Sequence, residues 1–397
     1  MTATQRHQLT AWTNAVTMAV IFATFVYLGI DFPERVDCVT RFIDFHAIWG
    51  AARLALEGSI VSAFDRSVLE QAYGACGEVK MYWLYPAPMT PLITPLGLLP
   101  FLAAFLGFVI ASIAVLFLSL RSFLPNDRPA LIAFAFAPAW LPALVIGQFT
   151  LFWCAGLMAA ITAIRANRPV IAGLILGLLT VKPTLGLLIP VVLLADRRYL
   201  TIVVAMISTI ALHLSALAIY GFDYLQAWVT ATRDHGANLA ENLIELKAMG
   251  SIATFLAQMG ASNDLALRTN AAALVILGIL LFFVWRKAGA RSDAACAALC
   301  AALPLSTPYL WHNDVAFSAL VALFLYRADT ANHSVLFRCV LFVLWAGPGL
   351  TIINAYTLQI PWVMPATIDA PILMLALAAS VWQFGRQPTP PNESHAA

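Results

Sequence analysis

The chain has 397 residues, of which 61% are hydrophobic and 11% are charged, and its formal net charge is +2. Soluble domains contain roughly 45–50% apolar and about 25% charged residues, so this composition excludes an ordinary soluble globular protein. The apolar residues lie in long continuous blocks rather than in alternation, which favours membrane-spanning helices over a β-barrel. We therefore predict an all-α, polytopic integral membrane protein, and the net charge gives no indication of a nucleic-acid partner.

The first predicted element is an apolar run over residues 15–30 that follows Arg6 and His7. No small-x-small cleavage site occurs before Asp31-Phe32-Pro33. We therefore expect an uncleaved first spanning helix rather than a secretory signal peptide.

Further apolar segments follow along the chain, and a full crossing requires about 20 apolar residues. We expect about twelve transmembrane helices, in the range of ten to twelve. The candidate spans are residues 14–30, 97–120, 130–146, 149–164, 169–181, 184–195, 199–220, 267–286, 292–305, 313–326, 336–353 and 368–385. The pair 169–181 and 184–195 is short and broken by Lys182-Pro183, and such a break is tolerated at membrane depth where it lines a cavity.

The basic residues of the short loops all fall on one side of this predicted topology. They are Arg121, Arg128, Arg165, Arg168, Arg197, Arg198, Arg286, Lys287, Arg291, Arg327 and Arg338, with Arg6 and Arg386 at the two ends. The positive-inside rule makes that side and both termini cytoplasmic. Residues 1–386 then form one transmembrane domain with two long outer loops, 31–96 and 221–266, and the Pro-rich tail 387–397 is expected to be disordered.

The first outer loop contains a predicted amphipathic helix over residues 44–58. Phe45, Ile48/Trp49, Ala52 and Leu56 form one apolar stripe, and Gly58 is a natural stop, so this helix is expected to lie in the membrane interface. Asp44 at its start has two compatible interpretations: an N-cap, or a general base at the boundary between water and lipid.

The same loop holds Cys38 and Cys76, which would form a disulfide or remain free thiols on an oxidising outer side. The other cysteines, Cys154, Cys296, Cys300 and Cys339, lie in apolar spans and are expected to be small core residues without a metal. The loop ends in an aromatic and proline cluster, residues 82–91. Its Tyr82 and Tyr85 fit either an interfacial aromatic belt or a wall that contacts sugar or phosphate.

Polar residues at breaks near the outer ends of the spans are further candidates. Gln148 lies in a tight turn after Gly147, Lys182 lies at the break of the short pair, and a polar break at 307–314 contains His312 and Asp314. Ionisable groups at such depth are costly and point to function. The alternatives are that Lys182 extends to the headgroups and that His312 pairs with Asp314.

The ordered set of these motifs resembles glycosyltransferase family 87, whose members belong to the GT-C superfamily. The motifs are Asp44-Phe45-x-x-x-Trp49-x-Ala51-Ala52-x-x-Ala55-x-x-Gly58, Tyr85-Pro86-Ala87-Pro88, Pro95–Pro100, Gly147-Gln148, Leu178–Thr184 before Arg197-Arg198, and Thr307-Pro308-Tyr309. The resemblance covers roughly residues 10–330. It implies a GT-C-like fold with interfacial helices in the first outer loop.

The resemblance also implies an activity. Family members transfer sugars, typically mannose, from polyprenyl-phosphate donors, and Asp44 matches the aspartate that is the presumed base. Lys182 matches the Lys-Pro of the short helical pair, and Asp314 falls where relatives carry His or Asp, although His312-Asn313 departs from the commoner pairs. The expected enzyme is an inverting hexosyltransferase of the bacterial inner membrane, with its active site on the periplasmic face and no cofactor or metal.

The donor would be a polyprenyl-phosphate-linked sugar and the acceptor a glycolipid or glycan, in contact with membrane lipids. Tyr82, Tyr85, Gln148, Lys182, His312 and Asp314 are the expected donor-binding residues. The leaving lipid phosphate needs positive charge and hydrogen-bond donors more than it needs a metal, and no Asp-x-Asp motif occurs. The alternative functions are a secondary transporter, whose charges would meet at the bilayer midplane, and a lipid-linked-sugar flippase.

Overall fold

The computed structural model describes residues 44–74, 81–328, 334–356 and 364–386. Every regular secondary-structure element within these residues is a helix. Their one β contact is an isolated bridge between Met249 and Trp311. The predicted all-α fold is therefore confirmed for this part of the chain. The candidate span 14–30, Cys38, Cys76 and the tail 387–397 lie outside the described residues.

Six helical stretches of the described residues are long and apolar enough to cross a membrane. They are Phe101–Phe123 (α5), Arg128–Ile146 (α6 to α7), Tyr199–Tyr220 (α11), Asn263–Arg291 (α14 and its end), Val335–Ile352 (in α17) and Pro365–Arg386 (α18). Four more apolar helices are shorter: Thr150–Arg165, Pro169–Val181, Pro183–Ala195 and Asp293–Leu305. The expected twelve segments therefore include several helices that do not have the length of a full crossing.

The predicted break of the short helical pair at Lys182-Pro183 is confirmed. α9 covers Pro169–Leu178 and continues as the 3-10 turn η6, Leu179–Val181; after Lys182 come η7, Pro183–Gly186, and α10, Ile189–Ala195. At 1.5 Å per residue, α9 with η6 is about 20 Å long, which is less than the ~30 Å thickness of a hydrocarbon core. Lys182 therefore lies inside the bundle rather than beyond the far surface.

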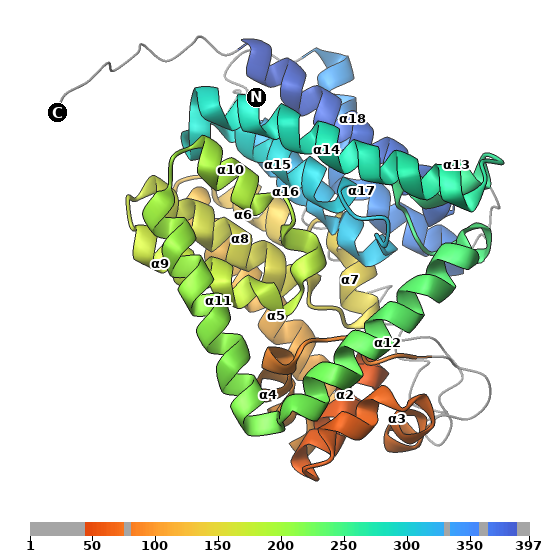
Figure 1. The fold of residues 1–397 in the computed structure, drawn as a ribbon. Coiled ribbons are helices and arrows are strands. Elements are labelled where there is room, and N and C mark those ends of the chain that lie inside the picture. Colours follow the sequence, from red (N-terminus) through yellow and green to blue (C-terminus); the bar gives the residue numbers. More distant parts are fainter. Residues whose placement is uncertain (1–43, 75–80, 329–333, 357–363, 387–397) are drawn as a thin grey trace.

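The centre of the helical bundle is formed by α15, Asp293–Leu305, and α16, Phe317–Ala328. Twelve of the thirteen α15 residues are buried, and this alanine-rich helix lets α16 and α18 pack closely against it. α11 has the opposite character, because Thr201 and Ala216 are its only fully buried residues. α11 lies at the edge of the bundle (Figure 1), so its exposed apolar side chains are available to lipid.

A separate unit of short helices is packed against one end of the bundle (Figure 1). It comprises α2 (Asp44–Leu56), η2 (Ile60–Phe64), α3 (Arg66–Tyr73), η3 (Ala87–Met89), α4 (Thr90–Ile93) and η4 (Thr94–Leu98), with α12 (Phe222–Glu241) running beside it. Asp65 caps α3 by accepting a bond from the backbone N–H of Ser67 at 2.8 Å, and Gly74 ends α3 in the left-handed conformation.

The predicted helix at 44–58 is confirmed as α2, and Gly58 follows it with φ +73°. Its apolar stripe is directed differently from the expectation. Phe45, Ile48 and Ala52 are completely or almost completely buried within the protein, while Leu56 is 43% exposed. The stripe packs on α5 and η4 rather than on lipid because three phenylalanines of α5, Phe101, Phe105 and Phe108, surround the ring of Phe45 with centroids 5.2–5.7 Å away.

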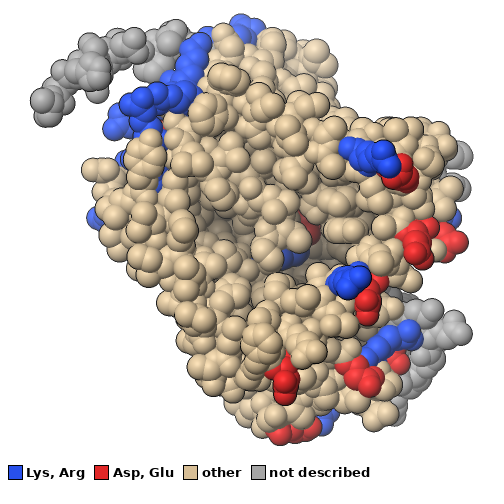
Figure 2. Space-filling model, viewed as in Figure 1, with Lys and Arg blue, Asp and Glu red and all other residues tan. Residues whose placement is uncertain are grey.

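Basic and acidic residues are distributed differently at the two ends of the molecule. Figure 2 shows a band of Lys and Arg at the end where α10 and α14 finish, and a mixture of both signs around the short-helix unit. At the basic end, Asp293 accepts bonds from Arg165 at 2.7 Å and from Arg327 at 3.1 Å. One carboxylate thus links α8 (Thr150–Arg165), α15 and α16 at this end.

Candidate functional site

The site begins where the first residues of α2 meet the turn after α7, Leu141–Ile146. Gly147 ends α7 with φ +73°, a conformation that a side chain would strain. A Cβ atom on Gly147 would also lie 2.5 Å from the Cβ atom of Phe45. The turn therefore approaches α2 closely, and this brings the amide nitrogen of Gln148 to the carboxylate of Asp44, to which it donates a hydrogen bond.

The orientation of the Gln148 amide follows from its two partners. The hydroxyl of Tyr85 donates to Gln148 Oε1 at 2.8 Å, while Gln148 Nε2 donates to Oδ2 of Asp44. An ionised carboxylate can only accept, so the amide must present its NH₂ group to Asp44 and its oxygen to Tyr85. Oδ1 of Asp44 has no partner among the described residues, which leaves it available to a substrate hydroxyl.

The extended segment that carries Tyr85 is held by α12. Trp83 Nε1 donates to the hydroxyl of Tyr224 at 2.9 Å, and that hydroxyl donates to the backbone oxygen of Tyr85 at 3.1 Å. Trp228 Nε1 donates to the oxygen of Leu84 at 2.9 Å. Two aromatic residues of α12 thereby fix the backbone that presents Tyr85 to Gln148.

A buried ion pair forms the second half of the site. Lys182 Nζ donates to Oδ1 of Asp314 at 2.7 Å. The Lys182 side chain is 15% exposed and the Asp314 side chain is 5% exposed. The same oxygen accepts from Thr150 Oγ1 at 2.6 Å and from Asn313 Nδ2 at 2.9 Å. Asp314 is thus well satisfied at Oδ1, while Lys182 uses one of its three N–H donors on it.

Lys182 reaches this position because of the proline that follows it. Proline disfavours the helical conformation in the preceding residue, and Lys182 is extended with φ −129° and ψ 79°. α9 runs parallel to α11, because Gly173 lies against Val204 and Gly177 against Ser208. Continuing this register sets Lys182 at the level of residue 213, roughly 10 Å inside the end of α11 at Tyr220.

The two halves of the site act on each other electrostatically. Burial raises the pKa of Asp44, the hydrogen bond from Gln148 and the charge of Lys182 oppose the increase, and the negative charge of Asp314 adds to it. Burial also raises the pKa of Tyr85 well above its ordinary value, so its hydroxyl keeps its proton and remains a donor. The geometry places a carboxylate of raised pKa near an ammonium group, two of whose N–H donors have no partner among the described residues.

The remaining sequence candidates lie elsewhere. His312 is buried on the opposite side of its turn, where Nδ1 faces Asp369 Oδ2 at 2.7 Å. Tyr82 is 42% exposed, and its ring centroid lies 4.6 Å from that of His235 on α12. The structure therefore brings together Asp44, Tyr85, Gln148, Lys182 and Asp314, and it separates His312 and Tyr82 from them.

Two of the alternatives weighed from the sequence are wrong in detail. Asp314 pairs with Lys182 rather than with His312, because η10, His312–Ala316, turns the two side chains to different sides. Lys182 is paired inside the protein and does not extend to the headgroups. Asp44 is the first residue of α2, and no contact of the described residues has its carboxylate capping a backbone N–H of that helix.

Three polar residues at or near these contacts were not identified from the sequence. Thr150 and Asn313 contribute bonds to Asp314, and Asn313 Nδ2 also lies 3.2 Å from Thr150 Oγ1. Asp369 is the partner of His312. Asn313 lies between the candidate residues His312 and Asp314, which is a local signal, whereas Thr150 and Asp369 lie near the starts of apolar segments and have none.

Figure 2 shows a hollow in this face of the molecule, between α11 and α12, with charged side chains of both signs at its floor. Within the described residues, no group of three or more His, Cys, Asp or Glu side chains could hold a metal ion.

A comparison with protein families matches residues 83–308, more than half of the chain, to glycosyltransferase family 87. Tyr85, Gln148, Thr150 and Lys182 lie within the matched residues, and Asp44 and Asp314 lie outside them. No curated protein and no solved structure gave a significant match.

Proposed function

The chain belongs to glycosyltransferase family 87, and from this premise we propose that it is a polyprenyl-phosphate-sugar-dependent hexosyltransferase of the GT-C type. It transfers a hexose, which we propose to be mannose, to a glycolipid or glycan acceptor. The reaction takes place on the periplasmic face of the bacterial inner membrane. Both termini are then cytoplasmic, and the reaction inverts the configuration of the sugar.

The observation that carries the proposal is the position of Asp44 beside the Lys182–Asp314 pair. The acceptor hydroxyl attacks the anomeric carbon, the bond from that carbon to the phosphate oxygen breaks, and the electron pair stays on the phosphate. Oδ1 of Asp44 takes the proton of the acceptor hydroxyl. Because its pKa is raised and Gln148 already holds Oδ2, this carboxyl is both oriented and basic.

Asp314 is the other carboxylate of the site, and it is less suited to act as the base. Its Oδ1 accepts three bonds, one of them from the Lys182 ammonium group at 2.7 Å. These donors already occupy Oδ1 of Asp314, whereas Oδ1 of Asp44 has no partner among the described residues. We assign to Asp314 the role of orienting Lys182.

Lys182 supports the departure of the lipid phosphate. An ammonium group has three donors, and the two that Asp314 does not use can bind phosphate oxygens. Hydrogen-bond donors that are already fixed where the negative charge of the leaving phosphate develops stabilise the transition state. Tyr85 and Gln148 line the sugar side of the same site. Tyr82, which is 42% exposed, would contact the substrate as it enters.

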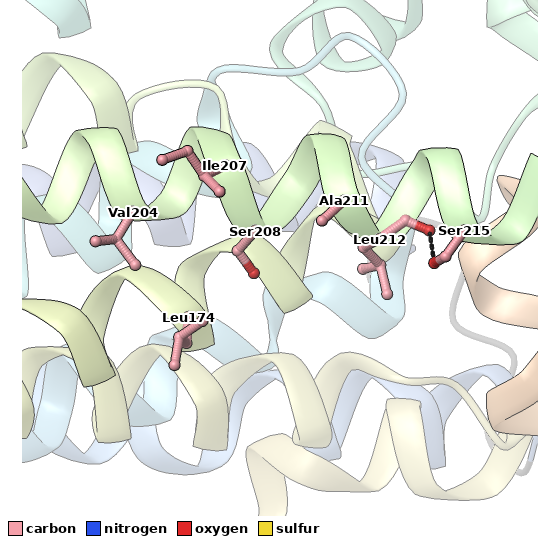
Figure 3. A pocket seen from close by; sticks show the side chains of 7 residues that line it. All are labelled: Leu174, Val204, Ile207, Ser208, Ala211, Leu212 and Ser215. Atoms are coloured by element: carbon pink, nitrogen blue, oxygen red, sulfur yellow. Dashed lines mark hydrogen bonds between the residues drawn. The ribbon is translucent and has the colours of Figure 1, made fainter.

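A lipid-linked donor also needs a path for its chain. A groove of about 510 Å³ runs along α11 on its side facing α9, between Leu174 and the stretch from Val204 to Ser215 (Figure 3). Its walls are apolar except for Ser208 and Ser215, and the Ser215 hydroxyl is bonded to the backbone oxygen of Leu212. The groove reaches the level of Lys182, so we propose that it holds the prenyl chain nearest the phosphate.

The alternatives are a secondary transporter or a flippase. A transporter would collect its charges near the midplane and use them in alternating access. The ion pair described above instead lies roughly 10 Å inside the end of α11 that adjoins the short-helix unit. Because α11 has 22 residues and is about 33 Å long, the pair lies in the half of this helix nearer the short-helix unit that carries Asp44, and this favours a reaction at one leaflet.

The test uses membranes that contain the full chain and a set of radiolabelled polyprenyl-phosphate sugars. We expect transfer of label to an endogenous or added glycolipid by the parental protein and loss of transfer in Asp44→Asn. The anomeric configuration of the product, read by NMR, should be opposite to that of the donor. Uptake or flipping of the donor without a new glycosidic bond would reject the transferase and support the alternatives.

A further inference from the structure

A second buried polar cluster lies behind the site, on the far side of η10. His312, Thr351 and Asp369 are each at most 6% exposed and come from η10, α17 (Val335–Tyr356) and α18. The reaction described above uses none of them. Burying such groups is costly unless they satisfy one another, so the cluster requires an explanation.

The hydrogen bonds define where the protons lie. Thr351 donates its hydroxyl hydrogen to the backbone oxygen of Pro348 at 2.8 Å. His312 Nε2 lies 3.0 Å from Thr351 Oγ1 and 3.2 Å from Pro348 O, and both of these can only accept there, so Nε2 carries a hydrogen. Nδ1 faces Asp369 Oδ2 at 2.7 Å, and one more proton is shared across that contact.

This cluster lies where three parts of the chain meet. The segment 247–250 of the second long loop pairs with residues 310–312: Gly250 N donates to Leu310 O at 2.8 Å and His312 N to Ala248 O at 3.1 Å. The N-terminal end of α18 joins them, because Ala366 N donates to Lys247 O at 3.1 Å. A Cβ atom on Gly250 would lie 2.3 Å from that of Asp369, so the loop segment is pressed against the pair.

η10 connects this cluster to the site. His312 is its first residue and Asp314 its third, and the two side chains point about 120° apart on a 3-10 turn. Asp314 meets Lys182 and Thr150 on one side, while His312 is held by Thr351 and Asp369 on the other. Rotation of the turn that released His312 would move the Asp314 carboxylate away from Lys182.

We infer that His312 and Asp369 are positioning residues, through which α17 and α18 hold η10 so that Asp314 orients Lys182. The inference rests on the proposed function and extends the site to helices beyond the matched residues 83–308. It also gives His312 a role other than direct contact with the donor.

Two substitutions of Asp369 separate positioning from a role that needs the charge. In Asp369→Asn the side-chain NH₂ can donate to Nδ1 of a neutral His312, whose Nε2 hydrogen stays on Pro348 O, so transfer should remain within about threefold of the parental rate. Asp369→Ala leaves Nδ1 unpartnered, and transfer should fall by about tenfold to a hundredfold, the range that a misplaced group costs. If Asp369→Asn is as damaged as Asp369→Ala, the positioning role is overturned.

A double-mutant cycle with Asp314→Asn then distinguishes positioning from general loss of folding. If Asp369 acts through Asp314, then Asp369→Ala costs little further activity once the Asp314 carboxylate is gone. Equal losses in both backgrounds would indicate a purely structural residue and overturn the inference.

The same cycle on the thermal unfolding midpoint needs no substrate. Coupling there, in a parental protein that transfers no sugar, would reject the proposed function and retain the positioning. Additive effects on the unfolding midpoint in such an inactive protein would overturn the positioning as well.

Discussion

Gln148 donates a hydrogen bond to the carboxylate of Asp44, although 104 residues separate the two along the chain. The contact joins the short-helix unit, which begins with α2, to the turn between α7 and α8. It holds one oxygen of Asp44 and leaves the other without a protein partner among the described residues. A base needs this combination of fixed orientation and an open lone pair.

Replacing Asp44 tests the base directly. The side-chain oxygen of an asparagine at this position can still accept the bond from Gln148, so we expect Asp44→Asn to fold like the parental protein. Sugar transfer should fall by about 10²–10⁴-fold, the usual contribution of a general base. The measurement is initial rate per amount of folded protein in membranes. Transfer at the parental rate would require another base.

The acidic limb of the pH–rate profile should depend on Gln148. If Asp44 is the base, transfer requires its ionised form, so the rate falls as the pH falls through the pKa of that carboxyl. Burial raises this pKa and the bond from Gln148 lowers it. Gln148→Leu removes the bond, so the acidic limb should move to higher pH.

Tyr85→Phe is the matched control for that shift. It removes the bond to Gln148 Oε1 and leaves the bond to Asp44, so it should shift the limb less. An acidic limb that stays in place in Gln148→Leu would show that another group titrates.

The close approach of Gly147 to α2 can be separated from the strain of its backbone. Gly147 and Gly58 both have φ +73°, but a Cβ atom on Gly58 would meet nothing within 4 Å, whereas one on Gly147 would meet Phe45. Gly58→Ala should cost about 1–2 kcal/mol of unfolding free energy from the left-handed conformation alone. Gly147→Ala should lower the unfolding midpoint further and also reduce transfer. If Gly147→Ala and Gly58→Ala have equal effects on the unfolding midpoint and on sugar transfer, the contact of Gly147 with Phe45 is unimportant.

Composition and local pattern predict most of the described helices and several residues of the candidate site. Apolar blocks gave the spans, and the apolar stripe with Gly58 gave α2. The glycine and proline breaks at Gly147-Gln148 and Lys182-Pro183 pointed to polar groups that the structure brings close to Asp44. Such breaks are informative because a chain at membrane depth keeps an irregular backbone only where neighbouring groups satisfy it.

The parts that could not be predicted depend on tertiary packing. The stripe of α2 was expected to face lipid, and only the position of α5 shows that it is covered by phenylalanines. The sequence also could not decide which way His312 and Asp314 point, because a residue's side on a short 3-10 turn depends on its neighbours. The partner of His312, Asp369, is 57 residues away and is the fifth residue of the largely apolar helix α18.

Lys182 should have separable effects on folding and on transfer. Lys182→Met leaves Asp314 buried without its cation, and breaking one side of a buried pair costs about 3–5 kcal/mol. The double variant Lys182→Met with Asp314→Asn has no unpaired charge, and Thr150 and Asn313 can still donate to the amide oxygen. We expect the double variant to recover most of the unfolding midpoint and none of the transfer. Recovery of transfer would exclude Lys182 as the cation for the leaving phosphate.

The groove along α11 yields the last prediction, which concerns the length of the donor lipid. Ala211→Trp puts a large side chain into the groove, and Ala272→Trp on α14 is the control because it lies outside the groove and is also exposed. Bilayer lipid is as apolar as these walls, so the groove contributes alignment rather than hydrophobic energy. Ala211→Trp should therefore raise KM severalfold for a long-chain polyprenyl-phosphate sugar and leave KM unchanged for a donor truncated to two isoprene units. A uniform increase for both donors would indicate a distorted helix, and no change for either would place the prenyl chain elsewhere.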